Sequence, residues 1–247
     1  MNVDWRKELT ELKKTNYNFP WVTAEITPAF NRLVYGMEEI TLKKGEILYD
    51  AGYESPYVFC LKSGRIINYI ITWEGNQKIL GIFTEGSLLG ETGIFDQQTD
   101  ECIAQVSSPK AVLWRIPRAV FQQRIQSDSE IMSIINRSFV TKIRLLSAHL
   151  ECVLFKSTVR KVAYMILSTA KYFGKVQEGG IFLDMRFTHV ETSNTLGVSR
   201  VSVTNSFLQL AEWGYIKKIP KGYVVTNVAA LRCLVEKGDE ENKFSDL

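Results

Sequence analysis

The sequence lacks any long apolar run. Of its 247 residues, 45% are hydrophobic and 23% are charged, and no apolar segment approaches the roughly 18 residues that cross a bilayer. The opening MNVDWRKELTELKK is charged and has no apolar core, which is not typical of an export signal. We therefore predict a soluble, cytoplasmic protein without a membrane partner, long enough for one large or two ordinary domains.

Cysteine and histidine are scarce, which excludes several classes of site. The four cysteines stand far apart, with no C-x-x-C pair, at Cys60, Cys102, Cys152 and Cys233. This spacing excludes a disulfide scaffold and a cysteine-based metal site. With two histidines, no phosphate loop and no Ser or Cys nucleophile beside a placed His, we expect neither an enzyme nor a bound cofactor.

Positive charge is concentrated in one part of the chain. The net charge is only +3, but residues 156–235 carry 11 Lys and Arg against 4 Asp and Glu. The preceding residues are close to neutral, and residues 236–247 form an acidic tail that we predict to be flexible. The basic segment is therefore the place to look for a polyanionic partner such as DNA.

A helix-turn-helix motif is predicted between residues 187 and 210. Thr188 and Glu191 have the spacing of a capping box, Gly197 suits a tight turn, and Ser199 suits the start of a second helix. The second helix is predicted to bury Val203, Phe207, Leu208 and Leu210. An inert helical hairpin is the alternative interpretation of this stretch alone.

A β-hairpin with a basic tip is predicted directly after this motif. Residues 213–216 end the second helix and begin a strand, and residues 223–226 form the returning strand. Helix, turn, helix and hairpin together indicate a winged helix, in which the N-terminal end of the second helix contacts base edges. The predicted DNA-contacting residues are Thr188, Ser199, Arg200, Val201, Ser202, Thr204 and Asn205, with Lys217, Lys218 and Lys221 on phosphates.

The middle of the chain is predicted to be a β domain. Seven short β-prone runs alternate with Gly-containing turns between residues 37 and 116, which is typical of an antiparallel sandwich or jelly roll of about eight strands. The preceding 30 residues are predicted to be a partly helical lead-in that packs on this next domain. The predicted fold class is thus α+β: an antiparallel β-roll, a long helix and a C-terminal winged helix.

A long dimerisation helix is predicted from residue 130 to about 154, after a short helix at residues 118–126. Its apolar residues repeat every seven positions, as in a two-stranded coiled coil, although Lys142 interrupts one row. The predicted dimer contacts are Met132, Ile135, Phe139, Leu146, His149 and Val153. The alternative is a helix that packs only on its own β domain.

These elements set the predicted domain boundaries. Residues 1–117 form the lead-in and the β-roll, and residues 118–155 form the short and the long helix. Residues 156–235 form the DNA-binding domain.

The order of these elements resembles the Crp/Fnr family of bacterial transcription regulators over about residues 30–230. The resemblance rests on the β-roll, the long helix, the stretch GSLLGETGIF at residues 86–95, and LGVSR at residues 196–200. It implies a homodimer that binds an inverted DNA repeat, contacts RNA polymerase and carries a small-molecule site between roll and helix. The implied effector residues are Gly90, Glu91, Thr92, Glu101, Cys102, Ile103, Ile143, Leu146, Ser147 and Leu150.

The sequence departs from the branches of the family whose effectors are well known. Members that bind cyclic nucleotides place an Arg-Ser where this chain has TDECIA at residues 99–104, and a carboxylate there would repel a phosphodiester. No cysteine precedes Cys60, which excludes the N-terminal iron–sulfur cluster of the oxygen-sensing branch. A small organic effector remains, as in the halophenol-sensing branch, which also has Val at the position of Val201.

Three other functions stay open. Haem-linked gas sensing would need His149 or His189 as a ligand, and redox sensing would use Cys60, Cys102 or Cys152. A ligand-binding signalling module without DNA binding would share the roll but would not need Arg200 or the basic hairpin.

The second helix of the motif also indicates the kind of DNA site. Members with the best-known site carry Arg-Glu where this chain has Arg200-Val201, and Arg in place of Asn205. Because Val201 can pack on a thymine methyl and cannot accept from cytosine, we predict an inverted repeat richer in A/T.

Overall fold

The computed structural model describes residues 3–52, 54, 56–154, 157–184 and 188–237. The chain forms two compact units: one is Trp21–Leu145, and the other combines Met1–Pro20 with Leu146–Leu247. No helix within these described ranges is long and apolar enough to cross a membrane. A break is predicted at residues 155–158, between the long helix and the next one; its first two residues, 155–156, and the acidic tail from residue 238 lie outside the described residues.

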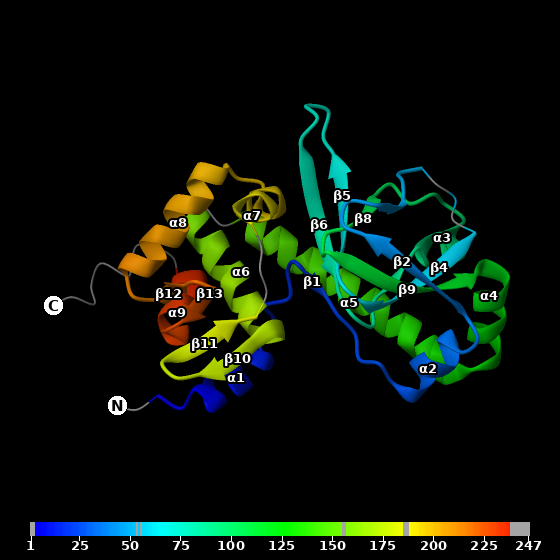
Figure 1. Ribbon diagram of the computed structural model, residues 1–247, viewed down its shortest axis with the longest axis horizontal. Helices are drawn as coiled ribbons and strands as arrows, with labels where there is room; N and C mark the ends of the chain where they lie inside the picture. The colour runs from blue at the N-terminus through cyan, green and yellow to red at the C-terminus, as the bar shows by residue number, and fades with distance from the viewer. Residues whose placement is uncertain (1–2, 53, 55, 155–156, 185–187, 238–247) are drawn as a thin grey trace. The chain divides into compact units, whose positions relative to one another are not determined.

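Two sheets build the roll of the Trp21–Leu145 unit, with strand orders β1-β6-β5-β8-β3 and β2-β9-β4-β7 (Figure 1). The strands are β1 Trp21–Val22, β2 Glu38–Lys43, β3 Ile47–Tyr49, β4 Tyr57–Ser63, β5 Ile66–Ile71, β6 Gln77–Phe83, β7 Leu88–Leu89, β8 Ile103–Val106 and β9 Lys110–Pro117. All seven predicted runs are strands. The two-residue strands β1 and β7 were not predicted, because so short a run shows no alternation.

The helices of this unit close the core of the roll. They are α2 Pro28–Val34, α3 Thr92–Asp96, α4 Arg118–Ser127 and the first part of α5 Ser129–Leu154. Phe30 of α2, Phe121 of α4 and Ile135 of α5 are all fully buried in one cluster with residues of β4 and β9. Helices α2, α4 and α5 therefore share one apolar core with the sheet β2-β9-β4-β7, which fixes the orientation of α5 on that sheet.

The second unit is a winged helix around α6. Its elements after α5 are α6 Thr158–Phe173, β10 Gly174–Gln177, β11 Gly180–Leu183, α7 His189–Leu196, α8 Arg200–Glu212, β12 Ile216–Ile219, β13 Gly222–Val225 and α9 Val228–Lys237. α6 is buried over most of its length, because α1, α8 and α9 all pack on it. The hairpin β10–β11 was not predicted; it extends the wing into a four-stranded sheet of order β10-β11-β13-β12.

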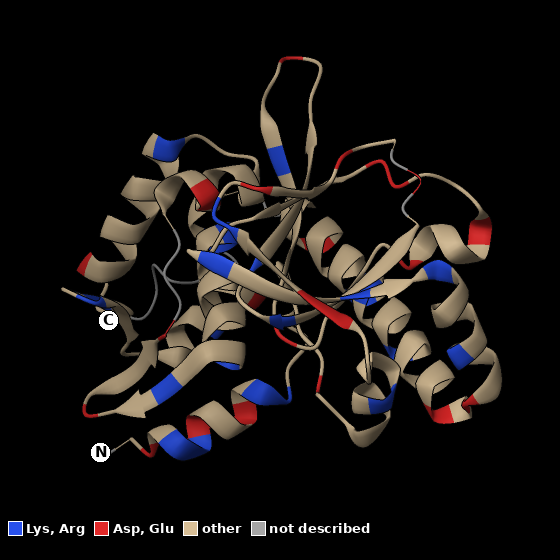
Figure 2. Ribbon diagram, turned by 45° about the vertical axis from the view of Figure 1, so that its right-hand side comes forward, with Lys and Arg blue, Asp and Glu red and all other residues tan. Residues whose placement is uncertain are grey.

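The N-terminal arm belongs to this second unit, which differs from the predicted domain 1–117. Its helix α1 Trp5–Lys13 keeps charges of both signs on its outside (Figure 2) and buries Leu12. Tyr17 donates to Glu236 at 3.1 Å, and Lys171 of α6 donates to the Thr15 carbonyl at 2.7 Å. The arm thus packs on the winged helix, and only the residues from Trp21 onward pack on the roll.

Candidate DNA interface and effector site

The helix-turn-helix forms through the caps that the sequence predicts. The Glu191 amide donates to the Thr188 hydroxyl at 3.0 Å, and the Thr188 amide donates to the Glu191 carboxylate at 2.9 Å. Gly197 ends α7 with a φ of 65°, a left-handed conformation that glycine adopts without steric cost. The Ser199 hydroxyl accepts from the Ser202 amide and begins α8. Phe187, at the start of the predicted motif, lies outside the described residues.

The exposed N-terminal face of α8 carries the predicted base-contacting residues. Arg200 and Asn205 are exposed, and Val201 is 69% exposed. The other two predicted residues on this helix are engaged inside the motif. Ser202 shares a hydrogen bond of 2.8 Å with the Ser199 hydroxyl, and the Thr204 hydroxyl donates to the Arg200 carbonyl at 3.0 Å.

Leu208 corrects the predicted apolar face of α8. Val203, Phe207 and Leu210 are buried as predicted, but Leu208 is 57% exposed. At about 100° per residue it lies on the same side of the helix as Val201, seven positions earlier. The helical period alone could have placed it there, so Leu208 joins the exposed row that begins at Arg200.

The wing presents its lysines to solvent and is tied to the motif by stacked rings. Lys217, Lys218 and Lys221 are exposed. Tyr223 of β13 stacks on Phe207 with a centroid distance of 4.7 Å, and Phe207 stacks on His189 at 5.3 Å.

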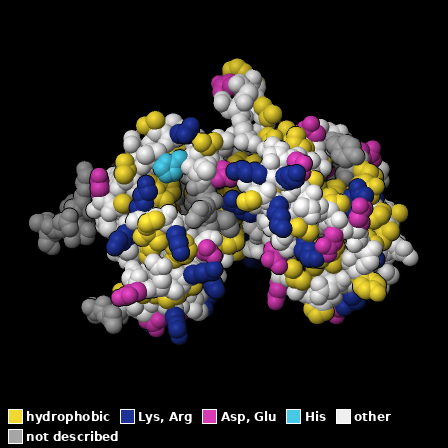
Figure 3. All heavy atoms as spheres, in the orientation of Figure 1, with side chains coloured by type: hydrophobic (Ala, Val, Ile, Leu, Met, Phe, Trp, Pro, Cys, Tyr) yellow, Lys and Arg dark blue, Asp and Glu magenta, His cyan; other side chains and the backbone are white. Residues whose placement is uncertain are grey.

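The pKa of His189 reflects the positive charge around these stacked rings. Burial lowers the pKa of His189 from its ordinary value, and the cations Lys218 and Arg200 lower it further. Figure 3 shows several Lys and Arg side chains on the visible face of this unit. Such a positive field favours phosphate binding.

Glu91 lies at the centre of the predicted effector site and is held by the long helix. Its carboxylate is fully buried, where Lys142 forms a salt bridge of 2.6 Å and Ser138 donates a hydrogen bond of 3.1 Å, both to Oε1. The other oxygen, Oε2, has no hydrogen-bond partner among the described residues. Ser138 and Lys142 were not predicted as part of this site, although a single cation in the apolar face of a helix is a usable signal.

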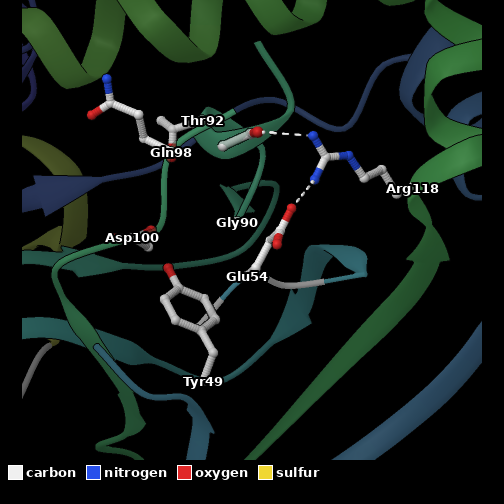
Figure 4. A pocket seen from close by; sticks show the side chains of 8 residues that line it. Tyr49, Glu54, Gly90, Thr92, Gln98, Asp100 and Arg118 are labelled. Atoms are coloured by element: carbon white, nitrogen blue, oxygen red, sulfur yellow. Dashed lines mark hydrogen bonds and ion pairs between the residues drawn. The ribbon is translucent and has the colours of Figure 1, made fainter. Parts of the chain in front are cut away.

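Next to Glu91, the pocket at Gly90 is small (Figure 4). Its volume is about 20 Å³, and its lining includes Tyr49, Asp100 and Arg118. Among the described residues of this lining, Arg118 is the cation; it donates to the Gly93 carbonyl at 3.0 Å and lies 3.5 Å from the Glu54 carboxylate. The space is about that of one water molecule, so the described pocket holds no nucleotide.

The remaining predicted effector residues are not brought together. Thr92 lines the same pocket as Gly90, Glu101 is exposed, Cys102 is half-buried, and Ile103 is buried in β8. On α5, Ile143, Leu146, Ser147 and Leu150 are all exposed. Ile143, Ser147 and Leu150 lie on a different face of α5 from Ser138 and Lys142, whereas Leu146 follows Lys142 by one helical turn.

The exposed face of α5 carries an apolar stripe that revises the predicted dimer contacts. Ile143, Leu146, Leu150 and Val153 repeat at alternating intervals of three and four residues and are 51–68% exposed. This is the a/d pattern of a coiled-coil seam. The predicted contacts Met132 and Phe139, nearer the helix start, are half-buried and pack against the core of their own unit, and Phe139 lies edge-on to Phe95.

Two predicted dimer contacts are wrong. Ile135 is fully buried in the core of its own unit. His149 stacks on Phe19 of the arm, with ring centroids 4.3 Å apart, and so faces its own chain.

The residues behind the haem and redox alternatives lie in unsuitable surroundings. Both histidines belong to the unit with the winged helix, and His189 shares a hydrogen bond of 2.8 Å with Thr204. Burial raises the pKa of Cys60 well above its usual range and, helped by Asp100, raises the pKa of Cys102 to about 11. Both thiols are therefore protonated at neutral pH and are weak nucleophiles. Within the described ranges, no three His, Cys, Asp or Glu side chains are grouped as metal ligands.

Comparisons with known proteins agree with this architecture. Residues 39–128 match the cyclic nucleotide-binding domain family, and residues 160–234 match the Crp-like helix-turn-helix domain family. The chain is 21% identical over 200 residues to the CRP-like cAMP-activated global transcriptional regulator of Mycobacterium tuberculosis, a match that covers 81% of this chain and 88% of that protein. It is 20% identical over 190 residues to the global nitrogen regulator of Synechococcus elongatus, covering 76% and 86%.

Solved structures share the fold. A CooA mutant from Carboxydothermus hydrogenoformans superimposes with a TM-score of 0.72 at 18% identity, covering 86% of this chain and 92% of that one. FixK2 from Bradyrhizobium japonicum gives a TM-score of 0.69 at 18% identity, covering 80% and 96%. With a sensor domain and a Crp-like helix-turn-helix in the same order as in these relatives, the chain belongs to the Crp/Fnr family of transcription regulators.

Proposed function

We propose that this regulator is a cytoplasmic homodimer whose affinity for an A/T-rich inverted repeat is controlled by a small organic effector other than cyclic AMP. The observation that carries the DNA part is the exposed row on α8. Arg200 there is free to grip a guanine edge, and Val201 and Leu208 beside it offer apolar contacts to thymine methyl groups.

The wing supplies the sequence-independent part of the interface. Lys217, Lys218 and Lys221 are exposed, and Lys218 is close enough to His189 to lower its pKa. Phosphate contacts of this kind position the reading helix and supply much of the affinity.

The stripe on α5 supports the dimer. Four apolar side chains in a heptad pattern, half or more exposed in one chain, are what a second copy of the same helix would cover. Two reading helices related by a twofold axis would meet an inverted repeat. We also expect this dimer to contact RNA polymerase, as regulators of the family typically do.

The charges inside the roll argue against cyclic AMP, even though five relatives are named as cAMP-activated regulators. A buried phosphodiester costs several kcal/mol unless a cation meets it. Lys142 is already paired with Glu91, Arg118 is bound to Glu54 and Gly93, and Asp100 lines the pocket. The effector is therefore expected to bind without a cyclic phosphate in this pocket.

The test is the salt dependence of binding to duplex DNA, measured by fluorescence anisotropy with a mixed-sequence duplex. Lys217→Ala and Lys221→Ala should each weaken binding and lower the slope of log K against log salt by about 0.9, the value expected for one phosphate contact. Lys13→Ala, an exposed lysine on α1 of the same unit, is the matched control and should leave the slope unchanged. Equal slopes for all four proteins would refute the proposed interface, and absence of duplex binding would favour a signalling module without DNA binding.

A further inference from the structure

A cavity of about 220 Å³ lies between the start of the roll and α5, apart from the small pocket at Gly90. Its walls come from three segments of the Trp21–Leu145 unit: residues 22–27, which we call the strap, residues 86–88, and the face of α5 from Ile134 to Thr141. An apolar cavity of about 150 Å³ is enough to bind benzene, so this space accommodates a benzoate-sized molecule.

Hydrogen bonds and a close backbone contact hold the strap against the roll, so the cavity is preformed. The Val22 carbonyl accepts hydrogen bonds from the Thr84 amide and from the Ser87 hydroxyl, both at 2.9 Å. A Cβ on Gly86 would lie 2.1 Å from the Ala24 carbonyl oxygen, so the strap runs directly over this glycine. Only a residue without a side chain permits that approach.

The chemistry of the lining is that of a site for a small polar organic molecule. The hydroxyl-bearing residues in it are Thr23, Thr27, Ser87, Ser138 and Thr141. Apolar atoms of Val22, Leu88 and Ile134 cover the rest. A pocket with apolar walls and a few converging polar groups is the usual form of a small-molecule site.

Arg137 favours a negatively charged ligand in this cavity. Arg137 is an exposed residue that lines the cavity, and it forms no salt bridge with any residue in the described part of the chain. Glu130, which lines a second pocket together with Arg137, is bound to Arg32 at 2.5 Å. Glu25 is the one carboxylate in the lining, and it is exposed on the strap. Arginine presents a planar set of donors that matches a carboxylate with two parallel hydrogen bonds.

The cavity is also connected to the elements that an effector must influence. Ser138 both lines it and donates to Glu91, whose carboxylate is bound to Lys142. The strap continues without a linker, at Pro20–Trp21, into the arm that packs on the winged-helix unit. A bound molecule would therefore contact both α5 and the strap, which leads along the chain to the arm.

We infer that this cavity, and not the pocket at Gly90, is the effector site, and that its ligand is a small organic carboxylate bound by Arg137. The inference rests on the proposed function, because it names the site and the class of the controlling molecule. Most of its walls, residues 22–27 and 134–141, lie outside the two segments matched by the domain families.

The test uses three probes of similar shape and different charge: 4-fluorobenzoate, 4-fluorobenzamide and 4-fluorobenzylamine. Binding to the full-length protein is followed by ¹⁹F NMR line broadening. We expect saturable binding of the benzoate, at least tenfold weaker binding of the amide, and no saturable binding of the amine. Arg137→Gln should weaken benzoate binding at least tenfold. Arg144→Gln, an exposed arginine on the same helix outside the cavity, is the control and should leave benzoate binding unchanged.

Preference for the amine, equal binding of all three probes, no saturable binding, or benzoate binding unaffected by Arg137→Gln would each overturn the inference. The salt-dependence experiment separates this failure from failure of the proposed function. Duplex binding without probe binding would support the DNA-binding function and refute the effector site. Arg137-dependent probe binding without duplex binding would support the effector site and refute the DNA-binding function.

Discussion

Single residues of this chain have roles that their local sequence does not show, and Lys142 is the clearest example. The sequence predicts that Lys142 interrupts the apolar seam of a dimer helix. In the structure, Lys142 forms a salt bridge with Glu91 of its own unit. The sequence could show that Lys142 was unusual. It could not show the partner, because Glu91 lies 51 residues earlier and meets α5 only after the roll has formed.

Replacing Lys142 tests this ion pair. Lys142→Met would leave the fully buried Glu91 carboxylate without its cation, and we expect the free energy of unfolding to fall by about 3–5 kcal/mol. The double variant Glu91→Gln/Lys142→Met should recover part of the loss, because no buried charge remains. Urea unfolding measures both values, and a Lys142→Met protein as stable as the wild type would show that the pair does not form in solution.

His189 offers a second test at the residue scale. Its pKa is lowered in the folded protein, so the unfolded chain binds the proton more readily. The free energy of unfolding of this unit should therefore fall as the pH drops below about 6.5 and through the lowered pKa.

Because Lys218 contributes to this shift, Lys218→Gln should move the pKa of His189 back upward in an NMR titration. Lys217→Gln, on the same strand, should leave it in place. The same pKa in Lys218→Gln as in the wild type would mean that the wing does not lie beside α7.

At the scale of elements, most of the secondary structure could be predicted, because the strands, caps and long helix each leave a local signal. The capping box of α7 and the end of α7 at Gly197 are of this kind. The arm was assigned to the wrong neighbour, since its charged sequence shows that one face packs and does not show on what. Tyr17 and Phe19 find that surface on the winged-helix unit, which is distant in sequence.

The helix α5 gives the prediction that belongs to this scale. Leu146→Asp places a carboxylate in the exposed apolar stripe, so we expect a folded monomer in sedimentation velocity and much weaker duplex binding. Arg144→Asp, exposed on the same helix outside the stripe, should stay a dimer. Ile135→Asp should unfold the protein, because Ile135 is fully buried. A Leu146→Asp protein that still sediments as a dimer would place the dimer contact elsewhere.

For the whole molecule, the family and the order of domains were readable from the sequence, but the effector was not. A sensor roll can serve many ligands, and they are separated by the geometry of the side chains that line the pocket at Gly90 and the cavity at the strap. That geometry depends on side chains from the strap, the roll and α5 together. No single stretch of sequence contains it.

This geometry predicts that cyclic AMP is not the effector. Isothermal titration of the purified protein with cyclic AMP should give no micromolar binding and no change in duplex affinity, because Arg118, the cation among the described residues that line the small pocket at Gly90, is bound to Glu54. Micromolar binding would require Lys142 or Arg118 to leave its carboxylate. In that case Lys142→Met or Arg118→Gln would abolish it.

We expect a dimer to read an inverted repeat through Arg200 and the exposed row beside it. Selection of bound sequences from a random duplex library measures whether it does. We predict an inverted repeat with half-site centres about one helical turn, or 10–10.5 base pairs, apart. A·T pairs should flank the position read by Arg200, and Arg200→Ala should lose about 1–3 kcal/mol of discrimination there. Recovery of no repeat, or of the same motif at the same strength with Arg200→Ala, would contradict the account.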